Sequence, residues 1–382
     1  MKEILILVFN DLRHDARVAR QVDFLSRHGK LTIVCFDAPP ELPAEIIRIP
    51  RIKPGLVTRA VTALLLLLRF FEPAYRMLYG VPSLVATLRK RRFDLVVAND
   101  IECLPLAFQV NQGAKVLFDA HEYAPRHFED KRVWRIFFQP FTTHLCRTWL
   151  PKVDAMTTVS EGLKKEYAKN FGVSPVVITN ASTYHDLQPS PLVPGRIRLV
   201  HHGAANPSRQ LELTIRMMDF LDERFELTLM LLTPAIANTR TRAYLDHLQT
   251  LVASQPRVRL IPAVASHEVV NAIHDHDIGI FLLPPVNFNY ANTLPNKFFD
   301  FVQARLAVAI GPTPEMAHLI QEHGFGIVSG AFTPESLAAA LNALKDGDIV
   351  RMKEQAHRAA PLLSAEGNRR LMDELLDGLA IR

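Results

Sequence analysis

Short apolar runs alternate with amphipathic helical patterns along almost the whole chain, and this alternation restricts the fold more than any other feature. In the first half, candidate strands lie at residues 4–9, 31–36, 94–98, 115–120 and 155–160. Between the first two, residues 15–30 place apolar side chains on one helical face and end in Gly29 at the expected C-terminal position. Units of this kind predict parallel strands covered by helices.

The alternation pauses at residues 188–196, where three prolines and a glycine interrupt it. It then restarts with candidate strands at residues 197–203, 227–232, 258–264, 278–284, 307–311 and 326–330. A chain of 382 residues exceeds the size of a single core, so two domains are expected. We predict an α/β protein with two Rossmann-like, doubly wound domains facing a cleft, where the carboxyl ends of the strands bind a ligand. The predicted parts are a first domain over 1–187, a linker over 188–195, a second domain over 196–365, and a C-terminal helix over 366–382 that packs back on the first domain.

Composition narrows the class of protein. Apolar residues make up 48% of the chain and charged residues 22%, which is typical of a globular protein. The net charge of +5 is compatible with anionic ligands or a membrane surface. Cys35, Cys103 and Cys146 lie far apart with no CxxC pair, which argues against a metal cage or disulfide framework and favours a reducing, cytoplasmic setting. The apolar N-terminus is too short for a signal peptide and predicts a first buried strand.

Residues 60–71 form the most apolar run of the chain. The run is shorter than the about 20 residues that a membrane-spanning helix needs. A buried helix is the favoured interpretation. The alternative is a membrane-facing helix, supported by nearby basic residues. These are Arg51, Lys53, Arg59, Arg69 and Arg76.

Residues 293–300 open a helix in a way that suits a nucleotide. Thr293 is a candidate N-cap and Pro295 fits the first turn, so free N–H groups at the helix start would face a phosphate. Asn296 and Asp300 share one helical face. A carboxylate there can accept hydrogen bonds from two vicinal hydroxyls, as on a ribose. On the residues alone, a carboxylate that stabilises its own helix dipole is an equal alternative.

Residues 293–316 resemble the donor-binding stretch of retaining family 4 glycosyltransferases, which have the GT-B fold. That family usually carries two acidic residues with seven residues between them; here the second is Asp300 and the first position holds Asn292. Residues 199–215 resemble its diphosphate loop, with Arg209 where a lysine is common and Ala204 where many members have an arginine. The donor-binding residues implied by the resemblance are Gly203, Arg209, Asn292, Thr293, Leu294, Asn296, Lys297 and Asp300.

Two segments of the first half are also similar to this family. Residues 118–130 resemble its histidine-containing turn, which implies catalytic roles for His121 and Glu122, with His121 contacting the donor sugar or its phosphate. Tyr123 and Arg126 would lie on the acceptor side. Residues 10–21 resemble the loop after the first strand. There Asp15 and Arg17, also on the acceptor side, are expected to hold the loop and the helix start rather than react.

The resemblance implies transfer of a sugar from a nucleotide-sugar donor to a glycan or polyprenyl-diphosphate-linked acceptor, with retention of configuration and without metal or cofactor. The expected setting is cell-surface polysaccharide synthesis in the cytoplasm, peripheral at the inner face of the cell membrane. Backbone groups at residues 262–264 are expected to recognise the base of the donor nucleotide. Two alternatives are a sugar-nucleotide 2-epimerase and a non-catalytic sugar-nucleotide-binding subunit, the latter suggested by Asn292 and Ala204.

Other motifs are excluded. Residues 275–277 spell DxD but connect a helix to a strand, which predicts a solvated turn. His201 and His202 alternate faces of a strand and cannot easily share one ion. No GxGxxG follows a strand, no GxxxxGK[ST] or GxSxG occurs, and the basic residues lack the interleaved aromatics of a nucleic-acid groove. We therefore predict neither a metal site nor a nucleic-acid partner.

Overall fold

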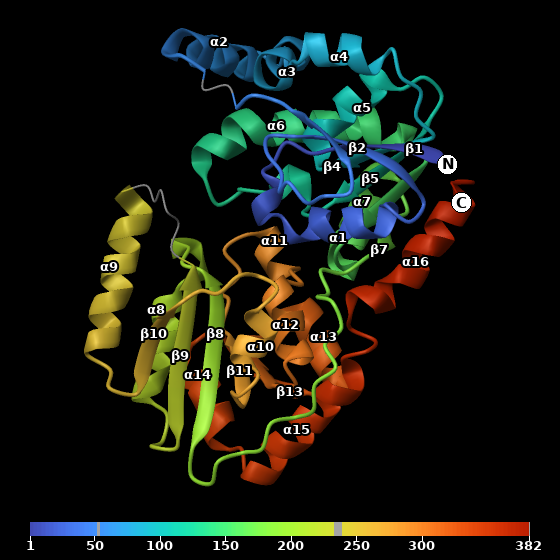
Figure 1. Cartoon of the computed structure of the whole chain (residues 1–382). Helices are drawn as coiled ribbons and strands as arrows, with labels where there is room; N and C mark the ends of the chain where they lie inside the picture. The colour runs from blue at the N-terminus through green and yellow to red at the C-terminus, as the bar shows by residue number, and fades with distance from the viewer. Residues whose placement is uncertain (52–53, 233–238, 382) are drawn as a thin grey trace. The chain divides into compact units, whose positions relative to one another are not determined.

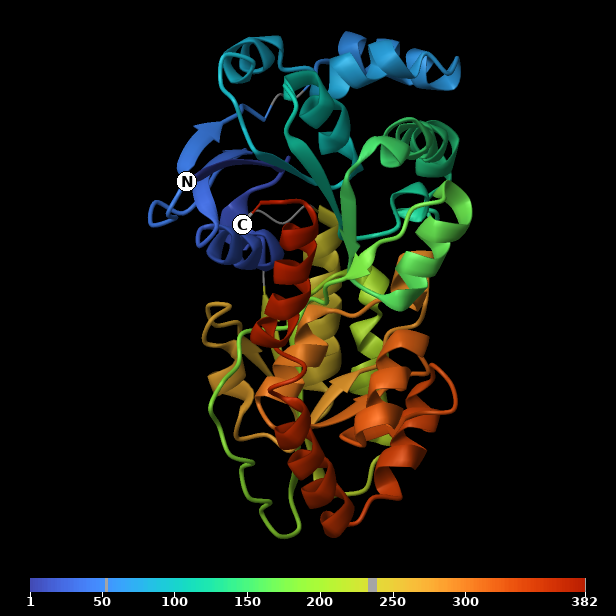
Figure 2. The ribbon, with the colours of Figure 1, turned by 90° about the vertical axis from the view of Figure 1, so that its right-hand side faces the viewer.

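The computed structural model describes residues 1–51, 54–232 and 239–381, and the chain forms two α/β units (Figures 1 and 2). Unit 1 comprises Met1–Thr179, Asn287–Asn289 and Arg369–Arg382; unit 2 comprises Asn180–Val286 and Tyr290–Asn368. Each unit has a parallel sheet with helices on both faces. This is the predicted class, two doubly wound α/β domains.

The sheet of unit 1 has the strand order β3-β2-β1-β4-β5-β6-β7, and the pairings between these strands are parallel. Its strands are β1 Lys2–Leu7, β2 Gly29–Cys35, β3 Glu45–Arg48, β4 Leu95–Asn99, β5 Lys115–Ala120, β6 Ala155–Thr158 and β7 Val176–Val177. The short edge strands β3 and β7 were not predicted. Gly29 does not end the preceding helix but begins β2, where it lies opposite Lys2. A glycine is needed there because a side chain would collide with the Lys2 carbonyl.

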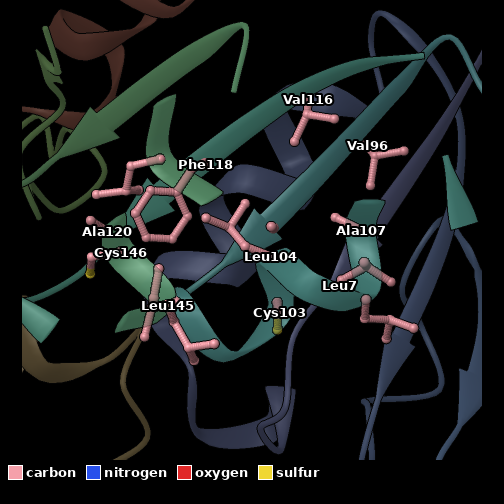
Figure 3. Close-up of a cluster of buried hydrophobic side chains, with 14 of the residues drawn as sticks. Leu7, Val96, Cys103, Leu104, Ala107, Val116, Phe118, Ala120, Leu145 and Cys146 are labelled. Atoms are coloured by element: carbon pink, nitrogen blue, oxygen red, sulfur yellow. The ribbon is translucent and has the colours of Figure 1, made fainter. Parts of the chain in front are cut away.

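Helices cover both faces of this sheet. They are α1 Ala16–Leu25, α2 Leu56–Leu67, α3 Phe71–Tyr79, α4 Pro82–Leu88, α5 Leu104–Val110, α6 Arg132–Trp149, α7 Glu161–Phe171 and α16 Ala365–Gly378. Alternate residues of β1 separate the two faces: Ile4 and Ile6 pack with α1 and α16, whereas Leu5 and Leu7 pack with helices of the opposite layer. Figure 3 shows this second cluster, which includes the free, buried thiols of Cys103 and Cys146.

The sheet of unit 2 repeats the same plan with the order β10-β9-β8-β11-β12-β13, again parallel. Its strands are β8 Ile197–Ala204, β9 Phe225–Leu232, β10 Val258–Pro262, β11 Ile278–Phe281, β12 Ala307–Ile310 and β13 Gly326–Val328. In each unit, the strands that directly follow the first one extend the sheet on one side of it, and the later strands extend it on the other side. This change of side falls between β1 and β4 in unit 1 and between β8 and β11 in unit 2. A crevice at the carboxyl ends of the strands is expected at such a switch point.

The helices of unit 2 are α8 Leu211–Arg216, α9 Thr239–Ala253, α10 Val269–Ile273, α12 Asn296–Gln303, α13 Pro314–His323, α14 Pro334–Asn342 and α15 Asp346–Ala359; the short α11 Phe288–Ala291 begins in unit 1 and ends in unit 2. One layer packs Leu199 of β8 against residues of α8, α9 and α14, and the other packs Val200 against α12, α13 and α15. Each unit thus has its own two-sided core.

The unit boundaries differ from the predicted domains. The chain enters unit 2 at Asn180, so residues 180–187 and the proline-rich segment 188–195 belong to unit 2 and do not form a separate linker. Hydrogen bonds explain this: Asn180 donates to the Leu294 carbonyl at 3.2 Å, and Ser182 accepts from the Ala365 amide at 2.8 Å. At the other end, α16 contributes Leu376 to the core of unit 1, and Figure 2 shows it beside α1.

The apolar run at residues 60–71 is not buried, so the favoured interpretation was wrong. It forms most of α2, and only Thr62 and Leu66 of this helix are buried. Leu64 and Leu67 are 55% and 54% exposed, because a helix that is apolar all round packs only one face on unit 1. Among the described residues, no helix combines the length and apolar character needed to cross a bilayer. Lys53, one of the nearby basic residues, lies outside the described residues.

Candidate functional site

The carboxyl end of β8 carries two converging cations. Gly203 has φ +120°, and a Cβ placed on it would lie 3.3 Å from both Arg209 Nη1 and Lys297 Nζ. Arg209 follows in a short 3-10 helix over Pro207–Arg209 and donates to the Ala204 carbonyl at 3.3 Å. Lys297 comes from the first turn of α12 and is only 4% exposed. The missing side chain of Gly203 therefore leaves space beside two positive groups, which suits an anion with several oxygens.

His201 fixes the position of Lys297. Nδ1 of His201 lies 2.9 Å from the Ile280 carbonyl and Nε2 lies 3.0 Å from Lys297 Nζ. Because a carbonyl only accepts, Nδ1 carries the ring proton and Nε2 accepts from Lys297. The Lys297 ammonium also lies 4.2 Å from the centre of the Phe281 ring. Burial, with Arg209 nearby, lowers the pKa of Lys297 well below its ordinary value.

Asp300 lies one helical turn beyond Lys297 and has its own supports. It accepts a short hydrogen bond from the Ser182 hydroxyl, and its Oδ2 lies 3.4 Å from Nε2 of His202. Burial, with Lys297 and Arg209 nearby, lowers the pKa of His202 to about 3, so this ring is neutral. Within the described residues, Nε2 of His202 has no hydrogen-bond partner. The carboxylate is thus held at the edge of the cationic site by Ser182, a residue far from it in sequence.

The start of α12 differs from the prediction. The helix begins at Asn296, and Pro295 is its N-cap with φ −77° and ψ 153°, so Thr293 does not cap it. Leu294 is 4% exposed and packs in the core of unit 2, which leaves only its backbone for a ligand. Asn296 is exposed while Asp300 is half-buried, and Asn292 lies half-buried in the preceding segment. Of the predicted donor-binding residues, Gly203, Arg209, Lys297 and Asp300 therefore lie closest together.

In unit 1, His121 follows the carboxyl end of β5 and lies between two carboxylates. Nδ1 is 3.5 Å from Asp100 Oδ2, and Nε2 is 3.4 Å from Asp119 Oδ2. Burial opposes a charge on the ring, but Asp100 and Asp119 outweigh it and raise the pKa of His121. Asp100 has φ +64°, a strained value of the kind that occurs at functional sites. The arrangement gives an oriented imidazole that is more readily protonated than a free one.

Asp119 is fixed in turn by α1. Arg17 makes a short ion pair with this carboxylate and donates to the Ile178 carbonyl at 3.0 Å. The Thr157 hydroxyl donates to Asp119 at 2.6 Å and the Gln21 amide at 3.2 Å. Burial would raise the pKa of Asp119, yet the Arg17 charge lowers it overall. Asp15 caps α1, where it accepts from the Val18 amide at 3.1 Å. Asp15 and Arg17 therefore hold the loop and the helix start.

The remaining candidates of residues 118–130 have different surroundings. Glu122 accepts from Nε2 of His127 at 2.8 Å. Tyr123 is 4% exposed, packs edge-on against Tyr167 at 4.8 Å, and is a core residue rather than an acceptor contact. Arg126 stacks over the Phe288 ring at 4.5 Å and donates to Glu129 at 2.5 Å. The Tyr123 amide donates to the Asn289 side chain at 2.7 Å, so Arg126 and Tyr123 both contact residues 287–289 of unit 1.

The DxD-like residues 275–277 are not a solvated turn. Asp277 is fully buried and accepts from Arg198 at 2.9 Å and Lys353 at 3.3 Å. His276 is 7% exposed and contacts the Thr228 hydroxyl at 3.1 Å. This network ties the amino ends of β8 and β11 to α15, away from the candidate site. Within the described ranges, no group of three or more His, Cys, Asp or Glu is placed to hold a metal ion.

Several polar residues of the site were not predicted. They are Ser182, His201 and His202 in unit 2, and Asp100 and Asp119 in unit 1. His201 and His202 had been considered only as metal ligands. Their positions at the carboxyl end of a buried strand, just before Gly203, were the available signal, since polar residues there commonly face a ligand.

Solved structures share this architecture. HepE from Anabaena, in complex with UDP and glucose, has a TM-score of 0.70 and 13% identity, with 99% of this chain and 100% of that chain covered. Sucrose-phosphate synthase from Thermosynechococcus elongatus has a TM-score of 0.69, 13% identity and 99% coverage of both chains. WaaG, a glycosyltransferase involved in lipopolysaccharide biosynthesis, has a TM-score of 0.65 and 12% identity, covering 96% of this chain and 99% of that chain. Two parallel units with these counterparts define the GT-B fold of glycosyltransferases.

A sequence match covers part of the chain. Residues 17–181 match the family model described as Glycosyltransferase Family 4. None of the curated proteins matches this sequence. Residues 17–181 are thus similar to Glycosyltransferase Family 4, and the whole chain has the GT-B fold that the resemblance implied.

Proposed function

We propose that this protein transfers a sugar from a nucleotide-sugar donor to a carbohydrate or lipid-linked acceptor, with retention of configuration and in cell-surface polysaccharide synthesis. One observation carries the proposal: Arg209 and Lys297 converge above Gly203 with Asp300 one turn away. Two cations suit a diphosphate, and a carboxylate beside them suits the two hydroxyls of a ribose. That UDP and UDP-glucose bind HepE, which has the same fold, supports a nucleotide-sugar donor here.

The chemistry follows from where charge develops. When the bond from the sugar to the diphosphate breaks, the leaving group gains negative charge. Arg209, Lys297 and the positive end of the α12 dipole would stabilise it without a metal ion. In the proposed retaining reaction, the departing phosphate itself takes the proton of the acceptor hydroxyl, so no enzyme nucleophile is assigned. His121, oriented by Asp100 and Asp119, would contact the donor sugar or its phosphate.

The test is a titration with UDP, GDP and dTDP, each with a chelator present, followed by calorimetry and thermal unfolding. We expect one diphosphate to bind and to stabilise the native state by roughly 2.7 kcal/mol at 100 times its dissociation constant. Asp300→Ala should weaken that binding because the ribose hydroxyls lose their acceptor. Asp348→Ala, which removes a half-buried carboxylate from the first turn of α15 in unit 2, is the matched control and should leave binding unchanged.

Assays of product formation distinguish the proposed transferase from the two alternative functions. Product formation only in the presence of an acceptor extract supports the transferase. Product from the donor alone would identify a 2-epimerase. Binding without turnover in native membranes would identify a sugar-nucleotide-binding subunit. If no nucleoside diphosphate binds, Asp300 is a helix-stabilising residue and the donor-site proposal is wrong.

We also infer that unit 1 meets a membrane surface through α2. Exposed apolar side chains of this helix include Leu56, Val57, Leu64 and Leu67, each at least half exposed. The exposed cations Arg59, Arg69 and Arg76 flank them. Apolar groups beside arginines suit the interface of an anionic bilayer. Contact with a bilayer would also bring unit 1 to a lipid-linked acceptor.

A further inference from the structure

Unit 1 contains a pocket that the donor chemistry does not use. Its volume is about 270 Å³, and its walls come from α3, α6 and the segments after β4 and β5. This is below the roughly 300–1,000 Å³ typical of drug-sized ligands, so the pocket suits a single ring. The side chains at its wall include Tyr79, Glu102, His127, Phe128, Trp134 and Phe138.

The walls are aromatic on several sides. Phe128 and Trp134 meet edge-to-face at 6.2 Å, and the His127 ring stacks on Phe128 at 3.9 Å. Tyr79 stacks on Phe9 at 5.4 Å, which holds the opposite wall. Flat rings of this kind pack against the C–H face of a sugar while leaving its hydroxyls free at the edge.

Two polar groups face this aromatic pocket. The Glu102 side chain lines the pocket, and its carboxyl accepts a hydrogen bond from its own backbone amide. Burial raises the pKa of Glu102 to about 7. His127 uses Nε2 for Glu122 at 2.8 Å, which leaves Nδ1 for a ligand. Burial opposes a charge on His127, but Glu122 outweighs it and raises its pKa. A carboxyl and an imidazole together can bind a pair of hydroxyls.

A short stretch of chain connects the pocket to the candidate catalytic histidine. Glu102 lies two residues after Asp100, and Asp100 contacts Nδ1 of His121 at 3.5 Å. Both segments leave the carboxyl ends of neighbouring strands, β4 and β5. A ring held at Glu102 would thus lie at the same edge of the sheet as His121.

We propose that this pocket binds the terminal sugar ring of the acceptor, an uncharged monosaccharide unit held between aromatic side chains and hydrogen-bonded by Glu102 and His127. The inference rests on the proposed function, because a second sugar site is needed only if the reaction joins a donor sugar to an acceptor sugar. It assigns acceptor recognition to residues 79, 102, 127, 128 and 134 rather than to Tyr123, which is buried in the core.

Tryptophan fluorescence gives a direct test, because the chain has two tryptophans, Trp134 and Trp149. Trp149 stacks on Phe108 and does not line the pocket, so in Trp149→Phe only Trp134 emits. The probes are methyl glycosides of glucose, galactose, mannose and N-acetylglucosamine. We expect at least one to shift the emission in a saturable way in Trp149→Phe and to leave the emission of Trp134→Phe unchanged.

Glu102→Gln supplies a second test, since glutamine has nearly the same shape and replaces one acceptor oxygen by a donor. The association constant of the responding glycoside should fall about tenfold, the effect of losing roughly one buried hydrogen bond. Binding of UDP should not change. If Glu102→Gln leaves glycoside affinity unchanged, the assignment of this carboxyl is wrong.

Two further results would overturn the inference. Saturable quenching of Trp134 by farnesyl monophosphate, with none by any glycoside, would make the pocket a site for an isoprenoid chain. No response to either probe, while UDP still binds in a Lys297-dependent way, would refute the pocket and leave the proposed function intact. Failure of UDP, GDP and dTDP all to bind would instead refute the proposed function.

Discussion

The Lys297 ammonium is buried against a neutral imidazole, and this predicts proton-linked ligand binding. Arg209 lies on the same side, while Asp300 is the nearby opposing charge. Without ligand, burial lowers the pKa of Lys297; a bound diphosphate adds negative charge and raises it again. Binding therefore takes up a proton between these two pKa values, and affinity falls as the pH rises through that interval. Calorimetry of UDP binding in buffers of different ionisation enthalpy measures the uptake.

Lys297→Met should abolish this proton uptake and weaken UDP binding. It should also stabilise the ligand-free protein by about 1 kcal/mol or more, as replacing buried ionic groups by apolar ones often does. Lys345→Met, at an exposed lysine of unit 2, is the control and should change neither property. Equal proton uptake in Lys297→Met and in the unmodified protein would show that another group titrates.

A comparison of Gly203→Ala with Gly113→Ala distinguishes the cost of backbone strain from the effect of a side chain beside Arg209 and Lys297. The φ of +120° should cost about 1–3 kcal/mol for any residue with a Cβ. Gly113 has φ +100° with nothing within 4 Å of an added Cβ, so Gly113→Ala carries the strain alone. Both variants should unfold at lower denaturant concentration, and only Gly203→Ala should lose UDP affinity. Unchanged binding in Gly203→Ala would mean that the anion does not occupy this space.

At the scale of elements, the ion pair between Arg17 and Asp119 joins α1 to β5. Asp119→Asn leaves the buried guanidinium without its partner, which should destabilise the protein by roughly 3–5 kcal/mol. It should also lower the pKa of His121, because Asp119 favours the charged ring. Denaturant unfolding and an NMR titration of His121 measure the two effects. Asp23→Asn breaks an exposed pair with Arg27 and should change the unfolding midpoint far less.

The exposed face of α2 gives a second prediction at this scale. We expect the unmodified protein to bind neutral phosphatidylcholine vesicles more weakly than anionic phosphatidylglycerol vesicles. Leu64→Glu should reduce pelleting with the anionic vesicles and leave the weak binding to the neutral ones unchanged. Leu362→Glu changes an exposed leucine of unit 2, 67% exposed against 55% for Leu64, and should leave vesicle binding unchanged. If the unmodified protein does not pellet with either vesicle, the membrane proposal is wrong.

At the scale of the whole molecule, sequence pattern predicted most strands and both sheets, because alternation and chain order are local signals. It missed what depends on contacts between distant segments. The leucines of α2 are exposed because their neighbours cover only one side of the helix. Asp277 is buried because Arg198 and Lys353 reach it from other elements. His201 was missed for the same reason, since its role depends on Ile280 and Lys297 lying opposite it.

Each unit has its own two-sided core, so the two should respond differently to a donor nucleotide. Gly203, Arg209, Lys297 and Asp300 all belong to unit 2. A ligand that binds only folded unit 2 stabilises that unit, by roughly 2.7 kcal/mol at 100 times its dissociation constant. We expect scanning calorimetry to show two transitions, of which UDP raises one. Asp300→Ala should remove the shift, and a single transition that moves as a whole would show that the units unfold together.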